Sequence, residues 1–395
     1  MNFSLPVNKI KGKKVLLRVD LNSPISKGKI IDNPRFKEAS NMISLLLKNK
    51  CSVVIISHQG RKGDSDYKEL KQHSRILSKY THSKIKYIDD LFGKKAIKSI
   101  RTLKNSNALI LKNVRSEEDE SNLSKNRYSI LCKNFDFFIN DAFSVSHREQ
   151  SSIIIPPKYL PSYFGINMQR EITALQEFKK LFSGKTLFII GGSKIADYLP
   201  LFNALKNKKI KLLASGVLAN LILLSKGHDL GFEEKWLKEK GYTKFIPELK
   251  KLLKEHSSQI ILPIDFAIDT GKRREISLSQ LPTNKKLLDV GNKTISFFKD
   301  EIKGAKAIFM KGPLGFSEYP KFSFGTTSIL KELSNQSKSK KVFTLLGGGH
   351  LSTTISKYHI KDNFSYLSTS GGALIAFLSG KTLPGIEAIR HQTIS

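Results

Sequence analysis

The chain has 395 residues, 39% hydrophobic and 26% charged, a globular composition that is long enough to form two domains. No apolar run is long enough to span a bilayer, and the two cysteines, Cys51 and Cys132, indicate neither a disulfide framework nor a zinc site. The formal charge of +33 suits nucleic acid or small anionic substrates as partners, but the lysines are spread along the whole chain rather than gathered in one stripe.

Apolar runs alternate with helix-length amphipathic segments, which is typical of parallel sheets covered by helices. The strands expected in the first half are Lys14–Val19, Ser52–Ser57, Ala108–Lys112 and Phe135–Asn140. Cations and hydrogen-bonding residues lie at or soon after their carboxyl ends, namely Arg18, Asp20, Asn22, Arg35, His58, Arg61, Arg115, Asp141, His147 and Arg148. Ligands of open α/β sheets bind there, and guanidinium groups bind phosphate oxygens in pairs, so this half is predicted to hold a compact polyanion.

The segment Pro156–Gly165, PPKYLPSYFG, contains two proline breaks and precedes an expected helix, Asn167–Leu181. We therefore place the boundary between the halves at residue 165. Two other stretches, Ser116–Arg127 and Ser334–Lys341, are polar without carrying a motif.

Glycines follow the expected strands of the second half, which are Leu187–Ile190, Lys211–Ala214, Gln259–Ile264, Ala307–Met310, Val342–Leu346 and Phe364–Ser368. The glycine turns are Gly191–Lys194, Ser215-Gly216, Gly312–Gly315, Gly347–His350 and Ser370–Gly372. The last turn leads into a short apolar helix, Ala373–Leu378, with Gly380 placed to end it and Pro384 to prevent it from resuming. Glycines let the backbone approach a ligand closely, and a turn before a helix offers free amides to phosphate, so this half is predicted to bind a nucleotide.

Two nucleotide-binding motifs are absent. The GKT fragments at Gly184–Thr186 and Gly380–Thr382 lack the leading glycine of a P-loop, and no GxGxxG occurs. Two lobes with complementary anion sites then predict phosphoryl transfer between them, a reaction that requires mainly alignment, cations and amide donors.

The motifs RVDLNSP, SHQGR, KNVR, NDAFSVSHR, KYLPSYFG, GGSKIAD, LPIDF, GPLGFSE, TLLGGGH, STSGGA and GKTLPGIEA together resemble the phosphoglycerate kinase family, in its archaeal branch, along essentially the whole chain. The resemblance implies two Rossmann-like three-layer αβα lobes with parallel sheets, joined by a hinge. The expected parts are a phosphoglycerate lobe (1–165), a nucleotide lobe (166–380) and a tail that returns to the first lobe (381–395).

The family reversibly transfers the acyl phosphate of 1,3-bisphosphoglycerate to ADP with magnesium, giving 3-phosphoglycerate and ATP. The resemblance implies a phosphoglycerate site formed by Asp20, Asn22, Arg35, His58, Gln59, Gly60, Arg61, Arg115, His147 and Arg148. It implies a nucleotide site formed by Lys194, Gly216, Glu318, Gly347, Gly348, Gly349 and His350. Arg35, Lys194, Gly371 and Gly372 would act on the transferring phosphoryl group.

Several positions depart from the common pattern of the family. His350 stands where most members have an aspartate associated with the metal, so the metal ligands stay unassigned, and magnesium is expected to be held largely by nucleotide phosphates and water. Tyr198 stands where many members have a second phosphate-side lysine. Lys311 replaces an asparagine and Ser370 a glycine, and Lys311 is a candidate to restore the charge absent at Tyr198.

Two alternatives remain open from the sequence. One is a nucleic-acid-binding protein, which the charge allows but no motif supports, and a lysine-rich surface unrelated to function is the better single explanation of +33. The other is a different small-molecule kinase on a related fold. We expect a cytoplasmic protein because the N-terminus lacks the apolar centre of a signal peptide, and a monomer, with a dimer as the alternative.

Overall fold

The computed structural model describes residues 5–124, 127–339 and 342–392, and it divides into two compact units. One unit comprises residues 1–173 and 382–395, and the other comprises residues 174–381. The division falls inside helix α7 (Ile166–Lys180), eight residues after the boundary expected at residue 165. Among the described helices, none is long and apolar enough to cross a membrane.

The first unit is built on a six-stranded parallel sheet in the order β5-β6-β4-β1-β7-β8. Its strands are β1 (Lys14–Val19), β4 (Ser52–Ile56), β5 (Ile85–Tyr87), β6 (Ala108–Ile110), β7 (Phe137–Asp141) and β8 (Ser162–Phe164), and a two-stranded ribbon of β2 (Ile25–Ser26) and β3 (Lys29–Ile30) stands apart. Its helices are α1 (Val7–Ile10), α2 (Pro34–Lys48), α3 (Lys71–Thr81), α4 (Lys94–Arg101), α5 (Arg127–Cys132), α6 (Ser151–Ile154) and α16 (Pro384–Arg390).

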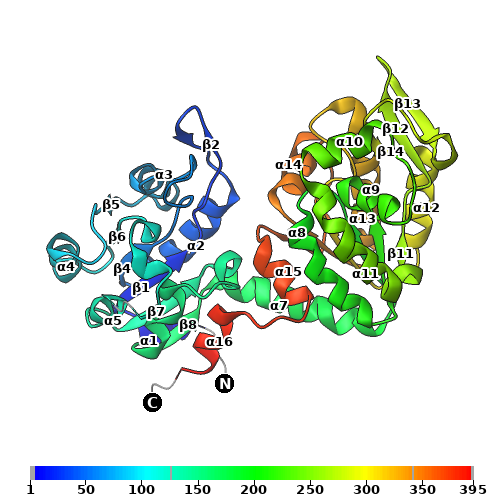
Figure 1. Ribbon diagram of the computed structural model, residues 1–395. Helices are drawn as coiled ribbons and strands as arrows, with labels where there is room; N and C mark the ends of the chain where they lie inside the picture. The colour runs from blue at the N-terminus through cyan, green and yellow to red at the C-terminus, as the bar shows by residue number, and fades with distance from the viewer. Residues whose placement is uncertain (1–4, 125–126, 340–341, 393–395) are drawn as a thin grey trace. The chain divides into compact units, whose positions relative to one another are not determined.

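Alternation along β1 sends side chains to both faces of this sheet, as expected for a buried parallel strand. Leu17 packs in one cluster with Phe36 and Met42 of α2, whereas Leu16 packs in another with Ile100 of α4. The sheet is therefore covered by helices on both sides, the arrangement shown in Figure 1.

The second unit contains another six-stranded parallel sheet, in the order β11-β10-β9-β15-β16-β17. Its strands are β9 (Thr186–Ile190), β10 (Ile210–Ala214), β11 (Ile260–Ile261), β15 (Ala307–Lys311), β16 (Phe343–Gly347) and β17 (Tyr366–Ser368). Its helices are α8 (Ile195–Tyr198), α9 (Gly216–Ser225), α10 (Phe232–Glu239), α11 (Ile246–His256), α12 (Asn292–Ile302), α13 (Phe324–Lys338), α14 (Gly349–Lys357) and α15 (Gly372–Leu378). The expected fold of two α/β units with parallel sheets is confirmed.

The sequence did not predict a small antiparallel sheet, β13-β12-β14, in the second unit. It is formed by β12 (Asp265–Asp269), β13 (Arg273–Ser277) and β14 (Leu287–Val290). The strand expected over Gln259–Ile264 is realised only as the two residues of β11, because the chain leaves the parallel sheet there and enters β12.

The C-terminal segment belongs to the first unit, where α16 lies beside β8 (Figure 1). Pro384 is the first residue of this helix, so it starts a new helix rather than merely preventing the previous one from resuming. The Gly385 amide donates to the Ser146 carbonyl at 2.9 Å, and the Gln392 side chain both accepts from the Ser162 amide and donates to the Ser162 carbonyl. The two Gln392 bonds satisfy the backbone of Ser162 in the edge strand β8.

Candidate functional site

In the first unit, the expected cationic residues follow strands that are neighbours in the sheet. The order β6-β4-β1-β7 places the carboxyl ends of four strands along one edge, because all of these pairs are parallel. Arg35 joins them from the first turn of α2, where the Asn33 side chain accepts from the Arg35 amide and Pro34 occupies the first helical position.

Asp20 orients Arg35. The Arg35 guanidinium forms an ion pair with Asp20 Oδ2 at 3.2 Å and donates to the Asn22 carbonyl, while Asp20 Oδ1 accepts from the Asn22 amide at 3.0 Å. Burial alone would raise the Asp20 pKa, but the Arg35 charge and hydrogen bonds from Ser144 and the Asn22 amide hold that pKa well below its usual range. Asp20 therefore stays ionised and positions a cation.

His58 is buried and neutral. Its Nδ1 lies 3.2 Å from Nη2 of Arg18, and burial together with the Arg18 charge lowers the His58 pKa well below its usual value. Arg18 itself is fully buried, bonding Ser152 Oγ and the Val19 carbonyl. The expectation that the Arg18 side chain is open at the strand end is wrong, because it is buried and contacts His58 Nδ1.

The remaining arginines are close enough to affect one another. Arg115 donates to the Gly60 carbonyl at 2.6 Å, and its pKa is lowered to about 10 by burial and by the charges of Arg18, Arg148 and Arg61. Mutual repulsion of this kind is relieved when a polyanion binds. His147 lies next to Arg148, with Nε2 at 3.4 Å from the Arg148 Nε.

The side chains of Gln59 and Asp141 are used by the protein itself. Gln59 is fully buried, accepts from Ser23 and His73, and donates to the Ser23 and Asp66 carbonyls, so its amide has no capacity left for a ligand. Asp141 accepts from the backbone amides of Asn167 and Met168 and caps α7, and burial raises its pKa to about 7. Gln59 was expected to bind the substrate and Asp141 to lie at a strand end of the site, and the hydrogen bonds of both side chains go to the protein.

Sequence reasoning missed Glu120, which lies in a stretch regarded as merely polar. It is buried and accepts from the Ser152 amide, Ser152 Oγ and the Tyr128 hydroxyl. Burial raises its pKa while the Arg18 charge opposes the rise, so Glu120 balances the buried Arg18 beneath His58. Nothing in the polar run distinguished this carboxylate, since its partners come from α5 and α6.

In the second unit, the glycine turns also share one edge, because β9, β15, β16 and β17 are adjacent and parallel. Their glycines differ in what surrounds them. A Cβ on Gly191 would lie 2.1 Å from the Pro313 carbonyl oxygen, and one on Gly312 would lie 2.3 Å from the Gly191 oxygen, so both are required by packing. A Cβ on Gly349 would meet no atom within 4 Å, and one on Gly371 only Lys311 Nζ at 3.8 Å.

Gly216 belongs to the packing group, since its Cβ would approach the Gly192 amide to 2.9 Å. By contrast, a Cβ on Gly347 would lie 2.5 Å from a methyl carbon of the flexible Leu374 side chain. Gly348 adopts φ +103°, and a Cβ there would meet no atom within 4 Å. Packing by itself therefore requires glycine at Gly191, Gly216 and Gly312. Contact with a nucleotide remains a prediction for these positions and for the turns that begin α14 and α15.

The other residues expected here, Lys194, Glu318 and His350, are exposed. Lys194 precedes α8, His350 lies in the first turn of α14, and the Glu318 carbonyl accepts from Lys357. Within the described ranges, no group of three or more His, Cys, Asp or Glu side chains is arranged to hold a metal ion.

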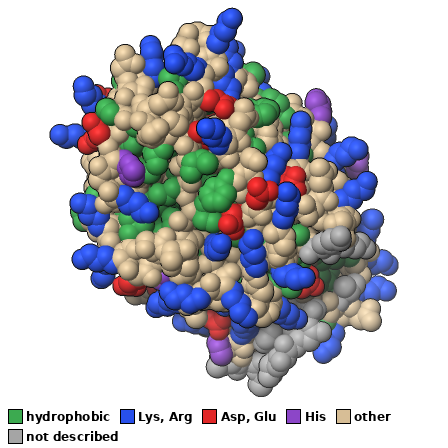
Figure 2. All heavy atoms as spheres, turned by 90° about the vertical axis from the view of Figure 1, so that its right-hand side faces the viewer, with side chains coloured by type: hydrophobic (Ala, Val, Ile, Leu, Met, Phe, Trp, Pro, Cys, Tyr) green, Lys and Arg blue, Asp and Glu red, His purple; other side chains and the backbone are tan. Residues whose placement is uncertain are grey.

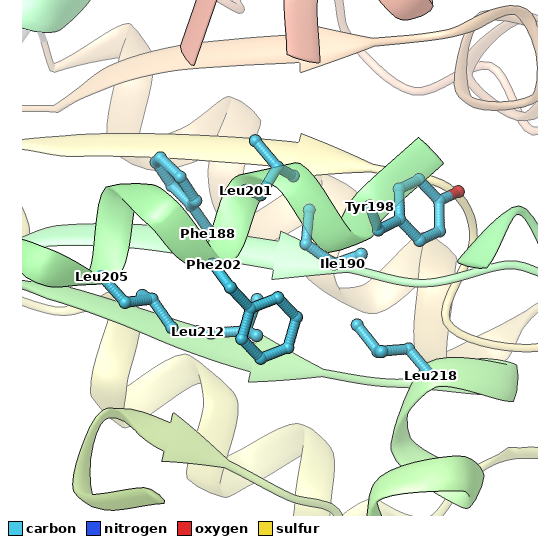
Figure 3. Close-up of a pocket in the computed structure, with 8 residues that line it drawn as sticks. All are labelled: Phe188, Ile190, Tyr198, Leu201, Phe202, Leu205, Leu212 and Leu218. Carbon is cyan, nitrogen blue, oxygen red and sulfur yellow. The ribbon is translucent and has the colours of Figure 1, made fainter. Parts of the chain in front are cut away.

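Tyr198 and Lys311 occupy different environments at this edge. Figure 3 shows the Tyr198 ring in an apolar pocket with Phe188 and Phe202 and its hydroxyl oxygen pointing away from their rings. A Cβ on Gly312 would lie 3.1 Å from that hydroxyl. Lys311 ends β15, is buried, and donates from Nζ to the Gly371 carbonyl at 3.0 Å.

Comparison with known proteins tests the family that the sequence motifs predict against the other kinase and the nucleic-acid-binding protein considered above. A family model described as phosphoglycerate kinase matches residues 6–381. The chain belongs to the phosphoglycerate kinase family. The phosphoglycerate kinase of Sulfurisphaera tokodaii is 37% identical over 98% of this chain and 95% of its own length, and that of Methanothermus fervidus is 36% identical over 96% and 95%. The crystal structure of phosphoglycerate kinase from Pyrococcus horikoshii OT3 matches with a TM-score of 0.90 at 32% identity, covering 98% of both chains.

The resemblance to archaeal phosphoglycerate kinases is thereby confirmed. The reaction of the family is phosphoryl transfer between 1,3-bisphosphoglycerate and ADP, giving 3-phosphoglycerate and ATP, and a carboxyl group is the acceptor in the reverse direction. On the face seen in Figure 2, lysine and arginine side chains are scattered with few acidic ones among them, and they form no single stripe such as a nucleic-acid backbone would follow.

Proposed function

We propose that each unit supplies one substrate site of the phosphoglycerate kinase reaction. The first unit holds the phosphoglycerate at Asp20, Asn22, Arg35, His58, Arg61, Arg115, His147 and Arg148. The observation that carries this proposal is the group of arginines, Arg18, Arg148 and Arg61, whose charges lower the pKa of Arg115. A ligand with a carboxylate and phosphate groups satisfies such a set through paired guanidinium contacts.

The second unit is proposed to hold the nucleotide at Lys194, Glu318 and the turns Gly347–His350 and Gly371-Gly372. Open space around Gly349 and Gly371 leaves room for phosphate oxygens near backbone amides, and Lys194 adds an exposed charge. Arg35 and Lys194 are the cations proposed to act on the travelling phosphoryl group.

Magnesium is proposed to arrive with the nucleotide. Magnesium favours oxygen ligands and retains waters, and the described residues form no carboxylate cluster, so a metal carried by ATP or ADP phosphates fits this site better than one held by the protein. When bound, it neutralises phosphate charge. The exposed imidazole of His350 would donate to a nucleotide phosphate beside the start of α14.

The test is a coupled assay with 3-phosphoglycerate, ATP and magnesium, followed by titration calorimetry of Arg61→Ala with each substrate separately. Arg61 is exposed and makes no ion pair with the described part of the chain, so its loss should weaken phosphoglycerate binding without disturbing the fold. Weakened ATP binding with phosphoglycerate binding intact would show that the two sites are assigned to the wrong units.

The proposal includes a monomer located in the cytoplasm, with a dimer as the alternative. Cys51 and Cys132 are buried free thiols, which is compatible with a reducing compartment. Size-exclusion chromatography with light scattering distinguishes the monomer from the dimer.

A further inference from the structure

Lys311 lies at the centre of the glycine-rich edge of the second sheet. It is the last residue of β15, which runs between β9 and β16, and its Cα pairs with Ile190 on one side and Gly347 on the other. These two partners are the residues from which the turns Gly191–Lys194 and Gly347–His350 begin. Lys311 thus stands between the two turns, and its ammonium reaches a third turn at Gly371.

The Lys311 ammonium is buried without an acidic partner. The residue is 6% exposed, and throughout residues 5–124, 127–339 and 342–392 no carboxylate lies within ion-pair distance of Nζ. Its one hydrogen bond within those ranges goes to the Gly371 carbonyl, which leaves two of its three donors for another group. A buried cation that lacks a counter-charge is costly, and a bound anion would supply the missing charge.

The charges around Lys311 also favour a bound anion. Burial lowers its pKa to about 8; Asp197 on α8 opposes this shift and Lys194 adds to it. Lys194 and Lys311 are therefore near enough to repel each other, as two cations do when they are arranged for one polyanion. The Tyr198 side chain, on the same helix as Asp197, fills the apolar pocket of Figure 3 and brings no charge to this edge.

We propose that Lys311 is a catalytic residue of the phosphoryl transfer, whose ammonium binds the oxygens of the transferring group together with Lys194. This inference rests on the nucleotide phosphates lying at the glycine-rich edge, as proposed above. The Gly371 contact has a second role, since it holds the ammonium beside the turn where open space remains. No bond to Lys311 forms or breaks during the reaction, and its contribution is electrostatic.

The test compares Lys311→Met with Lys311→Gln. Glutamine can still donate to the Gly371 carbonyl but carries no charge, so it separates the electrostatic role from a structural one. Both variants should lower kcat by about a hundredfold or more, with KM for 3-phosphoglycerate changed less than about threefold. The matched control is Lys306→Met, an exposed lysine just before the same strand, which should retain wild-type kcat.

A rescue variant strengthens the test. Lys311→Gln combined with Tyr198→Lys places a new ammonium near Gly312, because the Tyr198 hydroxyl already lies there, and it should recover at least about tenfold of the lost kcat. If Lys311→Gln keeps kcat within about threefold of wild type, Lys311 only pins the Gly371 turn and the proposal is overturned.

A measurement on the wild-type protein does not depend on the variants folding. Calorimetry of MgATP binding at pH 8.5 in buffers of different ionisation enthalpy should show uptake of a large fraction of a proton, because the γ-phosphate, which is the transferring group, favours the charged form of Lys311. Absence of proton uptake would overturn the proposal. A wild-type protein that forms no ATP in the coupled assay would refute the proposed function instead.

Discussion

Replacing either of two glycines by alanine should have different consequences, although both follow strands of the second sheet. At Gly191 the added Cβ would lie 2.1 Å from the Pro313 carbonyl oxygen and 2.8 Å from Ser215 Oγ. At Gly349, the first residue of α14, the Cβ would meet no protein atom within 4 Å. The first position is required by the fold, and the second faces the space proposed for phosphate.

The distances set the expected magnitudes. Since real Cβ contacts essentially never fall below 3.0 Å, Gly191→Ala must displace backbone rather than a flexible side chain. Overpacking of this kind costs about 1–3 kcal/mol, which corresponds to a fall in melting temperature of roughly 2–12 °C. Gly349→Ala gains up to about 1 kcal/mol of helix propensity, so its melting temperature should not fall. Its Kd for MgATP should rise at least about tenfold, or about 1.4 kcal/mol.

Thermal unfolding without ligand and calorimetric titration with MgATP measure the two effects separately. Equal destabilisation by both substitutions would show that the surroundings of Gly349 are closed. Wild-type ATP affinity in Gly349→Ala would refute the assignment of phosphate to the start of α14.

Three further expectations concern single side chains. Arg35→Ala should lower kcat by about a hundredfold or more while ATP affinity stays within about twofold; steady-state kinetics and calorimetry check this, and a few-fold change in kcat would contradict it. His350→Ala should raise the nucleotide KM by a few-fold, roughly the effect of one lost hydrogen bond, and elemental analysis that found stoichiometric zinc lost in this variant would contradict a phosphate-facing role. Burial lowers the His73 pKa from 6.5 to about 4, so the folded state resists protonation. The contribution of His73 to the free energy of unfolding should be full above pH 6.5 and should fall by up to about 3 kcal/mol as the pH drops towards 4. His73→Gln should flatten this part of a series of urea unfolding curves measured at different pH values. An unchanged slope in that variant would show that His73 is not the group responsible.

The long buried strands were predictable because their apolar runs are local signals. Lys14–Val19 matches β1 residue for residue, and the glycine and cation turns after these strands follow from the same pattern. The short strands β5 and β8, with three residues each, give no such signal. The antiparallel sheet was missed because nothing in the sequence distinguished β12, β13 and β14 from the loops that flank them.

The roles of individual site residues depended on contacts that sequence distance hides. Residue 191 must be glycine because of the nearby Pro313 carbonyl, and the side-chain oxygen of Gln59 already accepts hydrogen bonds from Ser23 and His73. The neighbours of Glu120 come likewise from other helices. A residue type at a strand end predicts that a site exists there, whereas only three-dimensional packing decides which side chains remain for a ligand.

The return of the last residues to the first unit has a consequence for synthesis on the ribosome. Residues 174–381 form a compact unit inserted between two parts of the other, so the second unit can be completed while the first still lacks α16 and Gln392. Until residues 384–392 have been synthesised, the Ser162 backbone on β8 has no Gln392 to pair with, and the Ser146 carbonyl has no Gly385 amide. The nascent chain therefore passes through a stage with an unprotected strand edge, a surface that can pair with another chain, and the emergence of residues 384–392 is the event that covers it.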